Sequence, residues 1–217
     1  MTNAASATFL SLRPLLDQGL SQLHLQLSEL QCVRLLDYVA LLEKWNKVYN
    51  LTAVREPARM IGLHLLDSLS VLPHLGKGAT LIDVGTGGGL PGIPLAIARS
   101  DLTISLLDTI AKKTTFVRQV IGEISLENAE AITARVEQFK PDNKFDIVVS
   151  RAFAELKDFV ECAGHLCSDG GVLLAMKGVY PHDEIARLPE SFTVAEVIAL
   201  NVPQIDGQRH LVVIKKK

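Results

Sequence analysis

The sequence has few cysteines, no long apolar run and no clear secretion signal. The three cysteines form neither an even set nor a Cys-x-x-Cys pair, which argues against a disulfide framework and against a zinc site. No apolar run approaches the roughly 18 residues that a membrane span requires. Residues 1–16 lack the basic start, continuous apolar core and cleavage site of a signal peptide. We therefore expect a cytoplasmic protein without a membrane segment or a bound metal.

An excess of charge of either sign is also missing. The 217 residues carry 22 lysines and arginines against 24 aspartates and glutamates, a formal net charge of −2. A nucleic-acid partner is therefore not required by global charge, and any such site would be a local basic face. With 48% hydrophobic residues, the length allows one large domain, or one domain with a small extension. We expect a monomer.

The periodicity of the chain changes near residue 78. Before it, apolar residues at spacings of three and four form one helical stripe: Cys32, Leu35, Leu36, Val39, Leu42 and Trp45. Trp45 is therefore interpreted as a core residue. A second helical stretch is predicted over 58–72, between two prolines. We divide the chain into an N-terminal helical extension, 1–77, and a main domain, 78–217.

Beyond residue 78, short apolar runs alternate with longer helical segments. The runs cover residues 80–85, 104–108, 129–133, 145–150, 170–177, 193–200 and 210–215. Most are β-branched and nearly continuous, as expected of strands buried on both faces. The alternation predicts parallel βαβ units, and the short link 201–209 predicts an antiparallel final pair. The fold class is α/β: a Rossmann-like, mostly parallel seven-stranded sheet with a terminal antiparallel strand.

A glycine-rich loop, residues 83–92, follows the first predicted strand and leads into a helix near 93–99. Glycines allow positive φ angles and close approach of a ligand to the backbone, and the helix start supplies free N–H groups. Asp108, 23 residues after Gly85, ends the second predicted strand. An acid at that tip can accept hydrogen bonds from ribose hydroxyls. Together these features indicate a ligand that contains adenosine.

Two ligand classes fit the loop. The dinucleotide pattern GxGxxG is matched by Gly87, Gly89 and Gly92. The pattern DxGxGxG of class I S-adenosyl-L-methionine-dependent methyltransferases is matched by Asp83, Gly85, Gly87 and Gly89. The glycine at the strand tip is Gly85, and counting from there places Leu90 where the dinucleotide motif needs its third glycine. This favours S-adenosylmethionine, and the cationic sulfonium and amine of that ligand suit Asp83. A dinucleotide site and a purely structural turn remain alternatives.

Several segments resemble one family of methyltransferases. They are DVGTGGGLPGIPLAIA (83–98), VSRAFAEL (149–156), LLAMKG (173–178) and GQRHLVVIKK (207–216), with KWNKVYNLTAVRE (44–56) and HLLDSL (64–69) near the N-terminus. The sequence is similar to the RsmG family, also called GidB, from about residue 35 to the C-terminus. The resemblance implies methylation of N7 of one guanine in a decoding-region loop of 16S ribosomal RNA (guanine 527 in the usual numbering of that RNA). The implied partner is 16S rRNA or the small ribosomal subunit.

The resemblance also implies site residues. The cofactor contacts carried over by position are Gly85, Leu90, Val136, Glu137 and Arg151, and Asp108 would hold the ribose, with Gly87 beside it in the loop. Candidate RNA-binding residues lie in loops and helix starts next to strand ends, where an open α/β sheet places its site. They are Lys112, Lys113, Arg118, Lys177 and Arg209, with the lysine tail 215–217.

The residues themselves are compatible with an N7 target. An exocyclic amine usually requires an [ND]PP[YF]-type motif after the fourth strand, where this chain has Ser-Arg-Ala-Phe, 150–153. A pyrimidine carbon requires a cysteine nucleophile, whereas Cys162 and Cys167 are interpreted as buried cysteines of a helix. Guanine N7 loses no proton during transfer, so we name no general base. Arg151 is a candidate orienter of the guanine or the cofactor.

Some interpretations stay open. Phe153 suits base stacking and core packing equally, whereas His64 and His210 are interpreted as structural, without a further ligand at metal spacing. Two other functions are compatible with the loop: methylation of a small molecule or a protein, and a regulatory module that binds an adenosyl ligand without transfer. Labelled S-adenosylmethionine offered with RNA or with metabolites separates these functions.

Overall fold

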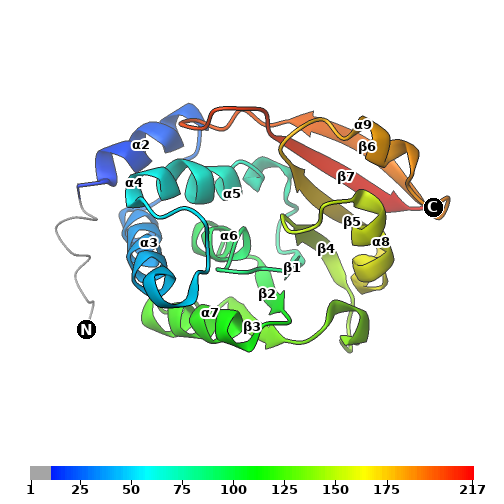
Figure 1. Cartoon of the computed structure of the whole chain (residues 1–217), viewed down its shortest axis with the longest axis horizontal. Coiled ribbons are helices and arrows are strands. Elements are labelled where there is room, and N and C mark those ends of the chain that lie inside the picture. Colours follow the sequence, from blue (N-terminus) through cyan, green and yellow to red (C-terminus); the bar gives the residue numbers. More distant parts are fainter. Residues whose placement is uncertain (1–10) are drawn as a thin grey trace.

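The computed structural model describes residues 11–217, which form a seven-stranded sheet with helices on both faces (Figure 1). Residues 1–10 lie outside the described residues. They include the start of the predicted N-terminal extension and most of the segment that we expect not to be a signal peptide. The strands are β1 Thr80–Val84, β2 Thr103–Asp108, β3 Ala129–Thr133, β4 Phe145–Ser150, β5 Cys167–Lys177, β6 Phe192–Ala199 and β7 His210–Lys216. All seven predicted strands are therefore confirmed.

The strand order is β3-β2-β1-β4-β5-β7-β6. The first five strands are parallel, and β7 runs antiparallel to both β5 and β6. This confirms the predicted sheet, including its antiparallel end. One residue was placed wrongly: Cys167 does not lie in a helix but begins β5, because a short 3-10 turn, Gly164–Leu166, ends the preceding helix and Cys167 then pairs with Phe145 of β4.

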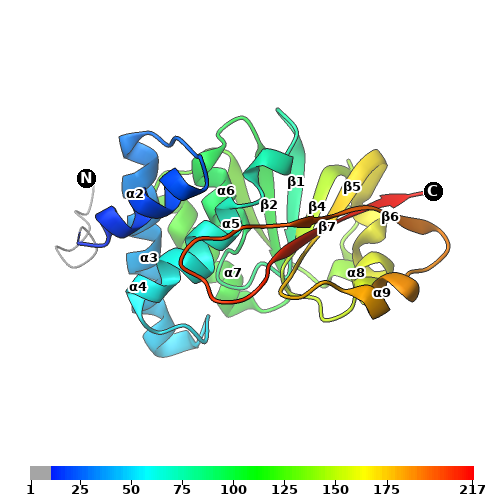
Figure 2. The ribbon, with the colours of Figure 1, turned by 90° about the horizontal axis from the view of Figure 1, so that it is seen from above.

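The helices are α2 Arg13–Gln22, α3 Glu29–Tyr49, α4 Pro57–Met60, α5 Asp67–Leu69, α6 Gly92–Ala98, α7 Ala111–Glu123, α8 Leu156–Ala163 and α9 His182–Ala186. Figure 2 shows α3, α6 and α7 on one side of the sheet and α8 on the other. Alternate residues of each strand point to opposite faces: in β1, Leu81 packs with the core under α3 and α6, and Ile82 packs with the core under α8. No helix within residues 11–217 has the length and apolar character needed to cross a membrane.

The N-terminal helices share their core with the sheet. Residues of α2 and α3 pack in the same buried cluster as residues of β1, β2 and β4. The side chain of Ser28 accepts a hydrogen bond from the Gln31 backbone and fixes the start of α3. Trp45 is half-buried and packs on this core, with its ring 5.5 Å from that of Phe116. The core is thus continuous across the predicted boundary at residue 78.

The predicted second helix, 58–72, is not one regular helix. A π-helix, Ile61–Leu66, separates α4 from α5, and a 3-10 turn, Leu72–His74, follows. Apolar periodicity does not distinguish these wider and narrower turns from an α-helix. A π-helical turn is rare and is often found near functional sites; this one leads directly into Asp67.

Candidate active site

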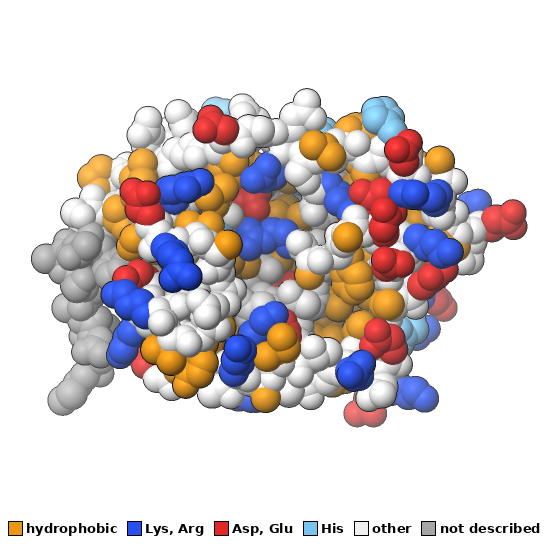
Figure 3. Space-filling view, in the orientation of Figure 1, with side chains coloured by type: hydrophobic (Ala, Val, Ile, Leu, Met, Phe, Trp, Pro, Cys, Tyr) orange, Lys and Arg blue, Asp and Glu red, His pale blue; other side chains and the backbone are white. Residues whose placement is uncertain are grey.

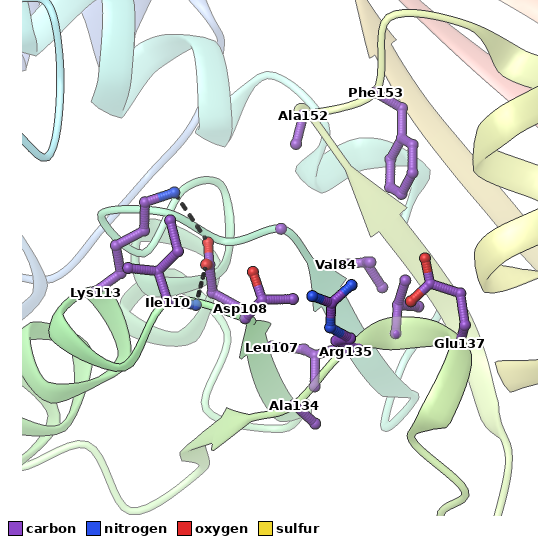
Figure 4. A pocket seen from close by; sticks show the side chains of 13 residues that line it. Val84, Leu107, Asp108, Ile110, Lys113, Ala134, Arg135, Glu137, Ala152 and Phe153 are labelled. Carbon is purple, nitrogen blue, oxygen red and sulfur yellow. Dashed lines mark hydrogen bonds and ion pairs between the residues drawn. The ribbon is translucent and has the colours of Figure 1, made fainter.

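The carboxyl ends of the parallel strands meet at the point where the strand order reverses, between β1 and β4. Ligands of open α/β sheets bind at this position. A cavity of about 300 Å³ opens there (Figure 4). It is lined by Val84, Gly85, Leu107, Asp108, Thr109, Ile110, Lys113, Ala134, Arg135, Val136, Glu137, Ala152 and Phe153. We call it the cofactor cavity.

The glycine loop forms one wall of the cofactor cavity. Gly85 has a φ of +74°, and its N–H donates to the Leu107 carbonyl across β2 at 2.9 Å. A Cβ on Gly85 would stand 2.8 Å from the Cβ of Ala152 in the opposite loop. The residue after β1 must therefore be glycine for two reasons, its backbone conformation and the closeness of the facing loop.

Two predicted cofactor residues lie behind this wall. Gly87 and Leu90 do not line the cavity: Leu90 is buried, and its N–H donates to the Thr86 carbonyl at 2.9 Å. The loop is held from the other side by the N-terminal extension, because the buried Tyr38 hydroxyl donates to the Gly88 carbonyl at 2.7 Å. The extension therefore fixes the conformation of the cofactor loop.

Asp83 organises the turn from β1 into α6. Its Oδ2 accepts hydrogen bonds from the Thr86 hydroxyl (2.6 Å) and the Gly92 N–H (2.9 Å). Its Oδ1 is buried without a partner among residues 11–217. Burial raises the pKa of this fully enclosed carboxyl to about 6. Asp83 does not line the cofactor cavity, and its carboxyl group holds the turn behind the loop.

This raised pKa predicts how stability changes with pH. The pKa of Asp83 is higher in the folded protein than in the unfolded chain, so the fold favours the protonated carboxyl. The free energy of unfolding therefore falls as the pH rises from about 4 through about 6, where the carboxyl ionises. Asp83→Asn keeps the two hydrogen-bond acceptor contacts and removes the charge. We expect its free energy of unfolding, relative to wild type, to improve by about 2–3 kcal/mol between pH 4 and pH 7. Urea unfolding across this range measures the difference, and a pH-independent difference contradicts it.

Asp108 forms the floor of the cofactor cavity at the tip of β2. Its Oδ1 accepts from the Ile110 N–H at 2.9 Å, and its Oδ2 accepts from the Gly87 N–H at 3.0 Å. Lys113, predicted to bind RNA, forms an ion pair with the same Oδ2 at 3.3 Å and lines this cavity. The carboxylate is thus fixed beside Gly85, with its position set by three donors from the loop and from the start of α7.

We expect Asp108→Asn to weaken S-adenosylmethionine binding by about 1–3 kcal/mol, the range for hydrogen bonds to a charged group. The matched control is Asp146→Asn, because Asp146 lies at the opposite end of the sheet, where it accepts from Thr80. Calorimetric titration of both variants measures the effect. An equal affinity for the two variants shows that Asp108 does not bind the ribose.

The remaining walls come from the loops after β3 and β4. Val136 and Glu137, both predicted, lie in a 3-10 turn, and Arg135 beside them was not predicted. Figure 4 shows this turn and the loop of Ala152 and Phe153 on different sides of the cavity. The Phe153 ring lies 5.3 Å from that of Phe159, which supports core packing, and it also lines the cavity. Stacking of Phe153 on a base stays a prediction.

Arg151 points away from the cofactor cavity. It lines a second cavity of about 370 Å³, where its Nη1 donates to the Leu63 carbonyl and to Asp67 Oδ2, both at 3.0 Å. Arg209 Nε donates to the other oxygen of Asp67 at 3.1 Å. The structure thus joins two predicted arginines through Asp67, a residue that the sequence reasoning missed. The available signal was an acid inside the apolar run of the π-helix and α5.

The other predicted basic residues differ in their surroundings. Lys112 is exposed at the start of α7, and Arg118, also exposed, donates to the Ala131 carbonyl and the Thr133 hydroxyl. Lys177 is mostly buried: it pairs with Glu184 at 2.7 Å and donates to the Phe153 and Ala154 carbonyls. Figure 3 shows lysine and arginine side chains in and around the hollow at the centre of this face.

The histidines and cysteines show no sign of a metal centre. His64 and His210 are buried in the wall of the second cavity, and no group of three possible metal ligands occurs in residues 11–217. Cys162 is half-buried on α8 and Cys167 is fully buried at the start of β5. Burial raises the pKa of both thiols, so neither is an activated nucleophile.

The fold and the site together define the class of protein. The sheet is mostly parallel and seven-stranded with an antiparallel end, a glycine loop follows β1, and an acid lies at the tip of β2. These features are those of a class I methyltransferase that uses S-adenosylmethionine. The family model of rRNA small subunit methyltransferase G matches residues 31–212, and the chain belongs to this family. It is a ribosomal RNA methyltransferase.

Sequence relatives agree with this assignment, and a solved structure agrees with the fold. The chain is 55% identical over 197 residues to ribosomal RNA small subunit methyltransferase G of Chromobacterium violaceum, covering 91% of this chain and 94% of that one. The protein of the same name from Laribacter hongkongensis is 52% identical, with 94% and 98% covered. A solved SAM-dependent methyltransferase from Aquifex aeolicus shares the fold, with a TM-score of 0.59, 20% identity, and 76% and 96% covered.

Proposed function

We propose that this protein transfers the methyl group of S-adenosylmethionine to N7 of one guanine in a decoding-region loop of 16S rRNA, guanine 527 in the usual numbering. The observation that carries the proposal is at the tip of β4. There Arg151, a hydrogen-bond donor, lines the second cavity, the next two residues line the cofactor cavity, and the chain has no exocyclic-amine motif at that point. Family membership supports an RNA substrate.

The residues of the cofactor cavity fit the proposed cofactor. A Cβ at Gly85 would fill the gap between the two facing loops, and Asp108 presents a fixed carboxylate to the ribose. Val136 and Glu137 would bind along the adenosine from the β3 side. Gly87 and Leu90 would act by shaping the loop, and Arg151 from the edge of the site. When bound, the cofactor supplies an electrophilic methyl carbon on a sulfonium centre.

Transfer to N7 places few demands on the protein. Guanine N7 carries a lone pair in the neutral base, so no proton has to be removed before it attacks. Catalysis then consists mainly of aligning N7, the methyl carbon and the sulfur, which can contribute several kcal/mol, up to about 7–11 for well-oriented reactants. This agrees with two cavities that no cysteine lines, and with the raised pKa values of the Cys162 and Cys167 thiols.

The RNA would bind over the face at the carboxyl ends of the strands. Lys112 and Arg118 are exposed on α7, and Arg209 faces the second cavity. The predicted lysine tail, 215–217, lies at the opposite end of the sheet, because β7 runs antiparallel to β5 and Lys216 Nζ donates to the Cys167 carbonyl at the start of β5. Lys113 and Lys177 would act indirectly, through the Asp108 ion pair and through the loop after β4. We propose that the protein acts as a monomer, in the cytoplasm, on 16S rRNA or the small subunit.

The experiment that tests the substrate class offers labelled S-adenosylmethionine with one of three acceptors: bare 16S rRNA, 30S subunits that lack the modification, or a pool of small metabolites and proteins. We expect label in RNA from at least one of the first two acceptors. Label confined to the third acceptor supports a small-molecule or protein methyltransferase. Cofactor binding without any transfer supports a regulatory module.

A further inference from the structure

The second cavity is separated from the cofactor cavity by a single turn of chain. Arg151 lines the second cavity, whereas the next two residues, Ala152 and Phe153, line the cofactor cavity. Lys177 holds this turn in place through its hydrogen bonds to the Phe153 and Ala154 carbonyls. A group bound in the second cavity therefore lies next to a cofactor bound in the first.

The lining of the second cavity suits a flat base with polar edges. Apolar surface comes from Val54, Leu63, Met176 and Leu200, and polar groups come from Asp67, Arg151, Arg209 and two histidines. The Nδ1 atoms of His64 and His210 are buried and have no partner within residues 11–217. Enzymes that modify a base take it out of the stack and read it between apolar contacts and hydrogen bonds to its edges. At about 370 Å³, the cavity is within the size range of small-molecule sites, about 300–1,000 Å³.

Asp67 forms ion pairs with both arginines of the second cavity. Its side chain is only 5% exposed, and each of its oxygens accepts from one arginine, at 3.0 and 3.1 Å. Two guanidinium groups repel each other, and the attraction of a carboxylate between them offsets that repulsion. Arg151 keeps its Nε and Nη2, and Arg209 its Nη2, without a partner in the described part of the chain. The carboxylate thus fixes two cations that still have donors available for a ligand.

We propose that the second cavity receives the target guanine and that Asp67 is a positioning residue, which holds Arg151 and Arg209 as donors to guanine O6. The inference rests on the proposed function. An arginine usually binds guanine through O6 and N7 together, but here the lone pair of N7 must stay free to attack the methyl carbon. Arginines whose inner donors are occupied by Asp67 can reach O6 without also donating to N7. The methyl group forms its new bond to N7, and the electron pair of the broken bond stays on sulfur.

The test combines a protein variant with a change in the target base. The RNA carries either guanine or 2-aminopurine at the target position of 16S rRNA assembled into 30S subunits; 2-aminopurine keeps N7 but lacks O6. We expect wild type to transfer at least about tenfold more slowly to 2-aminopurine in single turnover. Asp67→Asn should be slowed at least about tenfold on guanine RNA, whereas the further loss on 2-aminopurine should be under about threefold, because the O6 contact is already lost.

The controls separate positioning from folding. Asp101→Asn removes an exposed acid from another arginine pair, with Arg99, away from both cavities, and should keep the full wild-type discrimination. The melting temperature and the S-adenosylmethionine affinity show whether Asp67→Asn is folded. If Asp67→Asn is not folded, Arg209→Lys serves as the test variant. It keeps the charge but loses the planar fork, and it should show the same loss of discrimination between the two bases.

Each outcome decides the proposal. If Asp67→Asn slows transfer to both RNAs by the same factor, or if wild type does not discriminate between the bases, the proposal is overturned while the proposed function stands. If wild type transfers no methyl group to guanine RNA, the proposed function is overturned and the inference with it.

Discussion

Gly85→Ala is expected to remove most S-adenosylmethionine binding from a chain that still folds. Alanine at a φ of +74° is strained, and its Cβ would stand 2.8 Å from Ala152 Cβ. Either the β1 loop or the facing loop must move, and both loops are walls of the cofactor cavity. Because binding has to restore the original geometry, about 1 kcal/mol of backbone strain and about 1–3 kcal/mol of overpacking reduce the affinity, by roughly 30- to 1,000-fold.

The matched control is Gly78→Ala. Gly78 has a similar φ of +61°, but nothing lies within 4 Å of the position of its Cβ, and it is exposed at the other end of β1. It should lose about 1 kcal/mol of stability from the same strain and bind the cofactor normally. Isothermal titration of both variants, together with their melting curves, separates strain from loss of the cavity. Normal affinity in folded Gly85→Ala contradicts the position of the cofactor.

Transfer to RNA is expected to fall steeply with salt, whereas cofactor affinity should hardly change. The net charge of the chain is −2, so an RNA site has to consist of a local group of lysines and arginines. Each neutralised phosphate releases counterions, and six to ten such contacts reduce affinity by about 10³–10⁵ between 50 and 200 mM salt on double-stranded DNA; the slope for single strands is somewhat shallower. The cofactor binds within a cavity, where salt screens less than at the surface.

Three variants test which residues contribute to RNA binding and which contribute to transfer. Lys112→Ala should reduce the slope of log affinity against log salt by up to about one unit. Arg209→Ala should weaken RNA binding, and Arg151→Ala should reduce single-turnover transfer more than RNA affinity, because Arg151 stands beside the cofactor cavity. Filter binding and transfer rates across a salt series measure both quantities. A flat response in wild type contradicts an RNA substrate.

The sheet and the cofactor loop could be predicted from the sequence because their signals are local. A buried strand is a short apolar run, and Gly85 and Asp108 mark the ends of two such runs. The sequence predicts that Lys113 contacts RNA but gives no sign of its partner, because the ion pair with Asp108 depends on how the start of α7 turns. Leu90 likewise gives no sign in the sequence that it is buried behind the loop.

The second cavity could not be predicted in this way. It joins Arg151 and Arg209 to Asp67, from which they are separated by 84 and 142 positions in the sequence. No spacing rule connects them, and the π-helix that places Asp67 has the same apolar periodicity as a regular helix. Only the packing of the N-terminal extension against the carboxyl ends of β4 and β5 and the start of β7 brings these charges together.

The most direct test of the central claim identifies the methylated atom. Modification-free 30S subunits are incubated with the protein and S-adenosylmethionine labelled in the methyl group, and the 16S rRNA is then digested to nucleosides and mapped by mass spectrometry. We predict one labelled nucleoside, 7-methylguanosine, in a single fragment from the decoding-region loop, and none from Gly85→Ala at limiting cofactor. Label on an exocyclic amine, on a pyrimidine carbon or on ribosomal protein would contradict the account.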